Sequence, residues 1–293
     1  MSNQPPRVSR RSFDPPYFDD APWSERVQAW IALVKATFSD GNLRVVTAAI
    51  GDHDSGLRAV VNIGVTALLS MVTNGRYLNL YERPVIGGQP RKPSLERREV
   101  DRAMGIQGGN TYFAAVALGG AGVRYYGEYC MVLDLSGIDT DPSLFDRDSY
   151  DILVSPIAEA DRDNLVRQLK GSWANDVRDM VLMKVLPEVI HDRQLVTTGT
   201  VSDLILKDQE FIEVHLRPGQ DRSFGASEVE ELRESPDEVA VATRLAEREA
   251  AGERLSEVDY RWLTDREIVA RAVRQAGIRS RVVTQHGRGY QWK

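Results

Sequence analysis

The chain contains 293 residues, of which 42% are hydrophobic and 27% are charged. These proportions argue against a disordered chain and predict a globular protein with a buried core. The formal net charge of −6 disfavours a protein that wraps nucleic acid through its overall field, although a local basic patch remains compatible with it.

The N-terminal segment, residues 1–21, carries Arg7, Arg10 and Arg11 but no apolar run of the kind found in a secretory signal. We therefore expect it to be a flexible arm. No stretch approaches the roughly 18 apolar residues that a membrane span needs. Cys130 is the only cysteine, so it cannot form an internal disulfide and is expected to pack as a small apolar residue. These features predict a cytoplasmic protein.

The first elements follow from apolar spacing. Val27, Trp30 and Val34 recur at helical intervals behind Ser24, a good N-cap, and predict a helix of about fifteen residues. The remaining patterns before the centre predict a strand at 43–46, a strand or the start of a helix at 57–61, a buried helix at 65–73 that ends at Asn74-Gly75, a short strand at 76–83 and a polar helix at 94–105.

The stretch from Asn110 to Leu135 has the strongest pattern in the chain. Two runs rich in aromatic, Val and Ala residues flank the glycine-rich segment 119–122, which is typical of a β-hairpin. Both runs are apolar on both faces, so we expect strand 129–133 to lie at the centre of a sheet.

The segment 136–149 is predicted to be a loop, and it contains Asp139, Asp141, Asp146 and Asp148. Such an acidic group could hold a cation. Its spacing is not that of an EF-hand and no glutamate closes it, so no metal is expected.

The second half is predicted to be helical from 155 to 191, with a break at Gly171 and a kink or end at Pro187, and to return to strand at 204–216. Alternation in this strand places Glu210 on the same face as Ile212 and Val214, opposite Glu213 and His215. A carboxylate on an apolar face is costly unless it is paired or functional. Glu210 is therefore a candidate acid, base or cation stabiliser, unless it lies at the exposed start of the strand.

The C-terminal part is strongly charged. Residues 227–259 hold 11 acidic and 4 basic residues, whereas residues 261–293 hold 8 basic and 2 acidic ones. Both parts are predicted to be helical, and 279–292 is interpreted as a terminal hairpin that adds an edge to the sheet.

These elements predict an α/β (α+β) protein with a central mixed, largely antiparallel sheet flanked by helices. The predicted organisation is an arm at 1–21, a core at 22–216 and a charged helical extension at 217–293.

Motifs for nucleotide phosphate loops, dinucleotide folds, zinc sites and hydrolase triads are absent. Several short motifs resemble instead the ADP-ribosyltransferase fold, and most closely its DNA-targeting toxin branch. Gln209-Glu210-Phe211-Ile212 stands where that branch has a strand glutamate, and the resemblance extends over 57–216. It includes the strand and helix around 62–75, Thr111-Tyr112-Phe113, Tyr126-Gly127-Glu128 and the loop 146–150. The early His-Gly-Thr motif and the Gln/Glu-x-Glu motif of the arginine-modifying branch are missing.

The resemblance implies an NAD-dependent mono-ADP-ribosyltransferase of toxin or phage-conflict type that acts on a nucleic acid or a protein. Glu210 would be the catalytic carboxylate. Arg58, or Arg83 in its place, would bind the pyrophosphate of NAD, and Tyr112 and Tyr126 would shape or stack on the nicotinamide site.

Two alternatives remain open on the sequence alone. The first is a non-catalytic interaction protein that binds a partner through its charged C-terminal helices. The second is a metal-dependent nuclease that uses the aspartates of segment 136–149.

Overall fold

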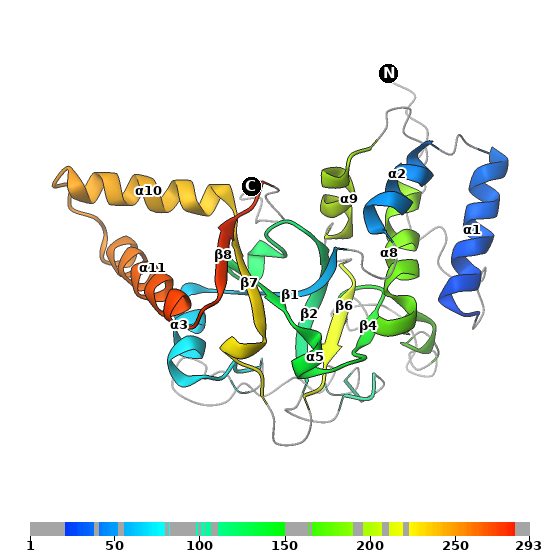
Figure 1. The fold of residues 1–293 in the computed structure, drawn as a ribbon, viewed down its shortest axis with the longest axis horizontal. Coiled ribbons are helices and arrows are strands. Elements are labelled where there is room, and N and C mark those ends of the chain that lie inside the picture. Colours follow the sequence, from blue (N-terminus) through cyan, green and yellow to red (C-terminus); the bar gives the residue numbers. More distant parts are fainter. Residues whose placement is uncertain are drawn as a thin grey trace.

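The computed structural model describes residues 21–37, 41–51, 56–79, 82, 98, 101–102, 104–106, 111–149, 164, 166–189, 196–206, 211–218 and 223–284. It confirms the mixed α/β class and the largely antiparallel central sheet (Figure 1). The helices are α1 (Trp23–Thr37), α2 (Gly41–Ile50), α3 (Val65–Asn74), η3 (Arg124–Tyr126), α5 (Leu135–Ile138), α8 (Trp173–Val189), α9 (Thr198–Ile205), η5 (Ala226–Glu228), α10 (Pro236–Ala250) and α11 (Glu257–Gln275). The strands are β1 (Leu57–Ile63), β2 (Tyr112–Leu118), β3 (Tyr129–Leu133), β4 (Ser143–Phe145), β5 (Lys170–Ser172), β6 (Glu213–Leu216), β7 (Val229–Glu234) and β8 (Arg279–Val282).

The sheet is split at its middle strand. Its order is β5-β4-β6-β2-β1-β3-β7-β8, and only the β7–β8 pair is parallel. β1 pairs with β2 over Leu57–Val60 and with β3 over Val60–Ile63. Because the two halves of β1 pair with different neighbours, the sheet consists of two blocks that meet at Val60.

The predicted hairpin at 110–135 is wrong. β2 and β3 do not pair with each other but lie on either side of β1. Each strand is buried along nearly its whole length, so each needs a neighbour that comes from elsewhere in the chain. The glycine-rich segment between them crosses the end of β1 instead of forming a tight turn. The central position predicted for β3 is confirmed.

The two faces of the sheet carry different clusters. One face, called face A here, joins the main core with residues of α1, α2, α3, α8, α9 and α11. The opposite face, face B, is formed by the intervening positions. On face B, Val60, Ala115, Cys130 and Val132 belong to a smaller cluster that also includes Phe211. The buried position predicted for Cys130 is confirmed, and burial raises the pKa of its thiol to about 12.

Predictions for the N-terminal half were confirmed in part. The first helix and the helix before Gly75 are present, and Gly75 has the expected left-handed backbone (φ 69°). The strand predicted at 43–46 is wrong, because this segment belongs to α2. Leu43, Val46 and Ile50 are buried at helical spacing, which a window of four residues cannot show. Residues 76–79 are not a strand; the other residues of that prediction are mostly outside the described ranges.

Predictions for the C-terminal half need more correction. Residues 204–205 end a helix, and the strand there begins only at Glu213. Segment 136–149, predicted to be a loop, contains α5 and β4. The break predicted at Gly171 in the helical stretch 155–191 is confirmed, and β5 lies there. The charged segment predicted to be helical from 227 contains β7, which follows η5 and pairs with β3. β8 is the predicted sheet edge; the rest of the predicted hairpin, 285–292, is outside the described residues.

The helices occupy two groups along the sheet. α1, α2, α8 and α9 lie beyond the β4 and β6 side, whereas α10 and α11 project from the β7 and β8 side with α3 beneath them (Figure 1). None of the helices in the described ranges combines the length and apolar composition of a membrane span.

Candidate functional site

The loop between β2 and β3 is fixed over the end of β1 by Asn62. The Asn62 amide donates to the carbonyl oxygens of Ala121 (2.9 Å) and Gly127 (3.1 Å), and its oxygen accepts from the Val123 N–H (2.7 Å). Gly127 lies so close to β1 that a Cβ there would stand 2.1 Å from the carbonyl carbon of Ile63. This close approach places η3 and its two tyrosines above face B.

A buried polar cluster lies on face B beside these tyrosines. Glu213 accepts hydrogen bonds from the backbone N–H (3.0 Å) and the hydroxyl (3.1 Å) of Ser149, and it contacts His215 Nε2. The Tyr126 hydroxyl donates to Asp148 (3.2 Å), the residue next to Ser149. All of these side chains except Tyr126 are buried. The hydrogen bonds offset the cost of burying the polar groups, so the cluster links β6, the segment after β4 and η3.

Tyr126 differs from the rest of this cluster in its exposure. Its side chain is 47% exposed, and its ring packs on Tyr125 with a centroid separation of 3.9 Å. Burial of the hydroxyl and the neighbouring Asp148 carboxylate raise the pKa of Tyr126, which keeps it protonated as a donor at neutral pH. Phe211, the residue that follows Glu210, meets Tyr126 edge to face at 6.1 Å.

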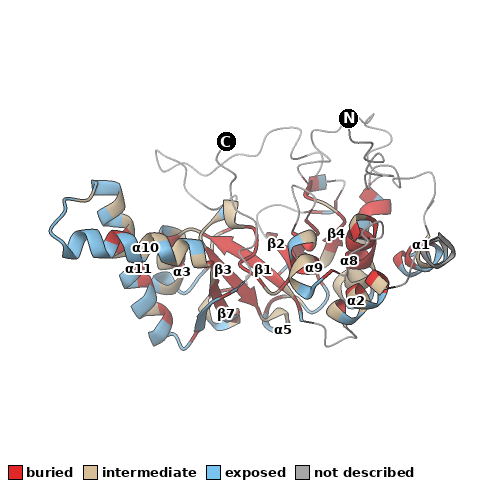
Figure 2. Ribbon diagram, turned by 90° about the horizontal axis from the view of Figure 1, so that it is seen from above, coloured by how far each residue is buried: buried red, intermediate tan, exposed pale blue. Residues whose placement is uncertain are grey.

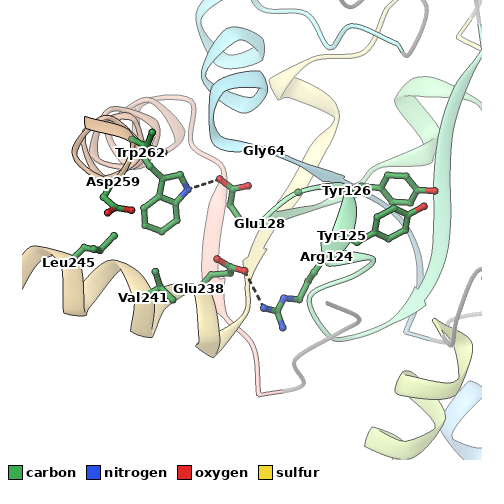
Figure 3. Close-up of a pocket in the computed structure, with 12 residues that line it drawn as sticks. Gly64, Arg124, Tyr125, Tyr126, Glu128, Glu238, Val241, Leu245, Asp259 and Trp262 are labelled. Carbon is green, nitrogen blue, oxygen red and sulfur yellow. Dashed lines mark hydrogen bonds and ion pairs between the residues drawn. The ribbon is translucent and has the colours of Figure 1, made fainter. Parts of the chain in front are cut away.

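An open groove of about 550 Å³ adjoins Tyr126 (Figure 3). One wall comes from the end of β1 and the segment 124–128, and the other comes from α10 and α11. The lining residues are Gly64, Arg124, Tyr125, Tyr126, Gly127, Glu128, Glu238, Val241, Leu245, Val258, Asp259 and Trp262.

Two sets of polar contacts hold the walls together. Glu128 Oε1 accepts from the Val65 N–H at the start of α3 (3.0 Å) and from Trp262 Nε1 (3.1 Å). A carboxylate is favoured at this helix N-terminus by the unpaired N–H groups there. Arg124 reaches across to Asp237 (2.9 Å) and Glu238 (3.1 Å) at the start of α10.

The structure places the predicted site residues in different surroundings. Glu210 and Arg83 lie outside the described residues. Arg58 is the second residue of β1 and alternates with Val60, so it belongs to face B; its Nε lies 3.6 Å from Glu230 Oε2. Tyr126 also lies above face B. Tyr112, by contrast, is buried in the main core against Tyr77 and Phe224, so the sheet separates it from Tyr126.

The four aspartates of segment 136–149 do not converge. Asp139 accepts from the Arg217 N–H (2.9 Å) and Asp141 from the Ala174 N–H (2.9 Å), whereas Asp146 and Asp148 are buried. Within the described ranges, no three His, Cys, Asp or Glu side chains are arranged to hold a metal ion.

Of the residues that build the groove, Tyr126 was predicted from the sequence as a site residue and the others were not. Asn62 is a polar residue in an otherwise apolar strand, which was a signal that could have been used. Glu128 and Trp262 gave no such signal, because their contact joins positions 134 residues apart.

Comparison of the chain with protein-family models, with curated proteins and with solved structures found no match.

Proposed function

We propose that this protein is an NAD-dependent mono-ADP-ribosyltransferase in which Glu210 is the catalytic carboxylate and Tyr126 borders the nicotinamide site. The observation that carries this proposal is the edge-to-face contact between Tyr126 and Phe211. Phe211 directly follows Glu210 in the sequence, so an exposed aromatic ring contacts the immediate neighbour of the candidate glutamate.

The surroundings of this contact support the proposal. Tyr126 and Tyr125 present two closely packed rings, tilted by 34° to each other, next to an open groove, and a planar, cationic nicotinamide is a suitable partner for such rings. The partly buried hydrogen bond from Tyr126 to Asp148 keeps the ring in place. Arg58 lies on the same face of the sheet and supplies a guanidinium, which pairs well with phosphate oxygens.

The proposed reaction is a substitution at the anomeric carbon of the ribose. The bond from C1′ to the pyridinium nitrogen breaks, and its electron pair goes to that nitrogen, which leaves neutral nicotinamide. A nucleophile of the acceptor, or water, forms the new bond to C1′ and gives up its proton. Positive charge develops on the sugar before the new bond is complete, and the Glu210 carboxylate stabilises it more in the transition state than in the ground state.

The proposal is tested by incubating the purified chain with NAD and measuring free nicotinamide by chromatography. We expect the wild type to release nicotinamide and Glu210→Gln to lose this activity by about a hundredfold or more, because electrostatic groups of this kind are typically worth that much. Asp208→Asn removes a carboxylate two positions earlier and should retain activity. Absence of nicotinamide from the wild type, or equal release by Glu210→Gln, would overturn the proposal.

A further inference from the structure

The groove beside Tyr126 has an apolar wall. Val241 and Leu245 from α10 and Val258 and Trp262 from α11 form it, and Val258 leaves 76% of its surface exposed. Trp262 is held in place by Glu128 on one side and by Arg266, whose guanidinium lies 4.7 Å from its ring. The wall is therefore a prepared apolar surface rather than a loose loop.

The rim of the same groove is acidic. Glu128, Glu238 and Asp259 each use one carboxylate oxygen within the protein: Oε1, Oε1 and Oδ2, respectively. Their other oxygens have no hydrogen-bond partner among the described residues, which leaves acceptor sites at the edge of the apolar wall. Among the described residues that line the groove, Arg124 is the one cationic side chain, and Asp237 and Glu238 already neutralise it.

This combination selects one class of occupant. A nucleic acid would bring its phosphates against the three rim carboxylates, which is unfavourable. A bare metal ion is not matched either, because the rim carboxylates lie around a groove of several hundred Å³ and do not converge on a point. An extended segment with arginine or lysine side chains between apolar ones fits both surfaces. Its apolar side chains would pack on the apolar wall, and its cationic side chains would pair with the rim carboxylates.

We infer that the groove binds a basic polypeptide segment with flanking apolar side chains, and that a protein carrying such a segment is the acceptor. Tyr126 lines the groove and also contacts Phe211, so a bound segment would lie close to the residue that is bonded to Glu210. The role of the segment as acceptor rests on the proposed transfer reaction, whereas its binding requires no NAD.

Binding is tested by fluorescence anisotropy with a short fluorescein-labelled peptide that alternates arginine with leucine. We expect saturable binding that weakens with salt, and about a tenfold loss of affinity in the double variant Glu128→Gln/Glu238→Gln. Glu249→Gln removes one charge from an exposed position of α10 outside the groove and should bind as the wild type does.

A second pair of variants separates loss of binding from loss of fold. Val241→Arg places a cation within the groove and should abolish binding, whereas Ala246→Arg, on the exposed surface of α10, should not. Circular dichroism checks that each variant is folded. No saturable binding, equal binding by all variants, tighter binding of a single-stranded DNA of equal length, or occupation of the groove by a second copy in light scattering would overturn the inference.

The two proposals fail in different ways. If the peptide binds but no nicotinamide is released, the transferase proposal is lost and the groove remains an interaction site. If nicotinamide is released but the peptide does not bind, the groove inference is lost and the reaction stands.

Discussion

The centre of the sheet and the α10–α11 hairpin use their polar side chains in opposite ways. At the centre, Glu213, His215 and Ser149 are buried and bonded to one another. On the hairpin the acidic side chains lie at the surface, and Leu245 is the only residue of α10 that is buried (Figure 2). The central polar groups therefore fix the fold around η3, whereas most acidic groups of the hairpin face the surface.

The largest expected effect comes from breaking the central cluster. Glu213→Ala removes the acceptor of both Ser149 bonds and leaves His215 buried without its partner. We expect the free energy of unfolding to fall by about 3 kcal/mol or more, as when one member of a buried polar pair is removed. Urea unfolding followed by tryptophan fluorescence measures this. A loss below about 1 kcal/mol would show that the cluster does not stabilise the fold.

A smaller loss is expected at the close approach between the loop and β1. Gly127→Ala would place a methyl group against the backbone of Ile63 and Gly64, and we expect a cost of about 2–3 kcal/mol. Gly252→Ala is the matched control on the hairpin, because a Cβ there would meet no atom within 4 Å; its cost of about 1 kcal/mol comes only from the positive φ of 79°. Similar urea midpoints for the two variants would contradict the tight packing.

Because of Cys130, the stability of the fold is expected to decrease at alkaline pH. Burial raises the pKa of its thiol from 9.0 to about 12, so the folded chain keeps a proton that the unfolded chain loses. The thiol therefore makes its full contribution to the free energy of unfolding below about pH 9. Above that pH the contribution decreases, by up to about 1.4 kcal/mol per pH unit. Unfolding at pH 9 and pH 10.5 should therefore show a steeper loss in the wild type than in Cys130→Ala. Parallel losses in the two proteins would contradict this.

The smallest effect on stability is expected on the hairpin. Arg124→Gln breaks the partly buried ion pairs of Arg124, whose side chain is 13% exposed, with Asp237 (53% exposed) and Glu238 (26% exposed), which should cost about 1 kcal/mol. The same change removes the cation from the described groove lining, so the arginine–leucine peptide should bind several-fold more tightly. Weaker binding by Arg124→Gln would show that the groove does not select a basic segment.

Periodicity in the sequence predicted the elements whose signal is local. The first helix, the helix ended by Gly75 and the central strand at 129–133 each carry an unbroken pattern, and each is present. The β-hairpin predicted at 110–135 is wrong because β1 lies between β2 and β3. This pairing depends on long-range contacts that the glycine-rich segment does not encode. Strand β7 was missed because its charged residues resemble a solvated helix when its neighbours are unknown.

The site was predictable only in its aromatic part. Tyr126 was selected from a short motif and does lie at an open groove, whereas Tyr112 came from a similar motif and is buried on the opposite face. A short strand motif identifies an aromatic residue, but it does not indicate on which face of the split sheet the side chain lies. The groove itself depends on contacts between Glu128 and Trp262, which no local pattern could indicate.

Release of nicotinamide from NAD, measured side by side for the wild type, Glu210→Gln and Asp208→Asn, tests the central claim most directly. The transferase proposal predicts release by the wild type and Asp208→Asn and a loss of at least about a hundredfold in Glu210→Gln. Undiminished release by Glu210→Gln would contradict it, because the carboxylate at position 210 would then have no part in the chemistry.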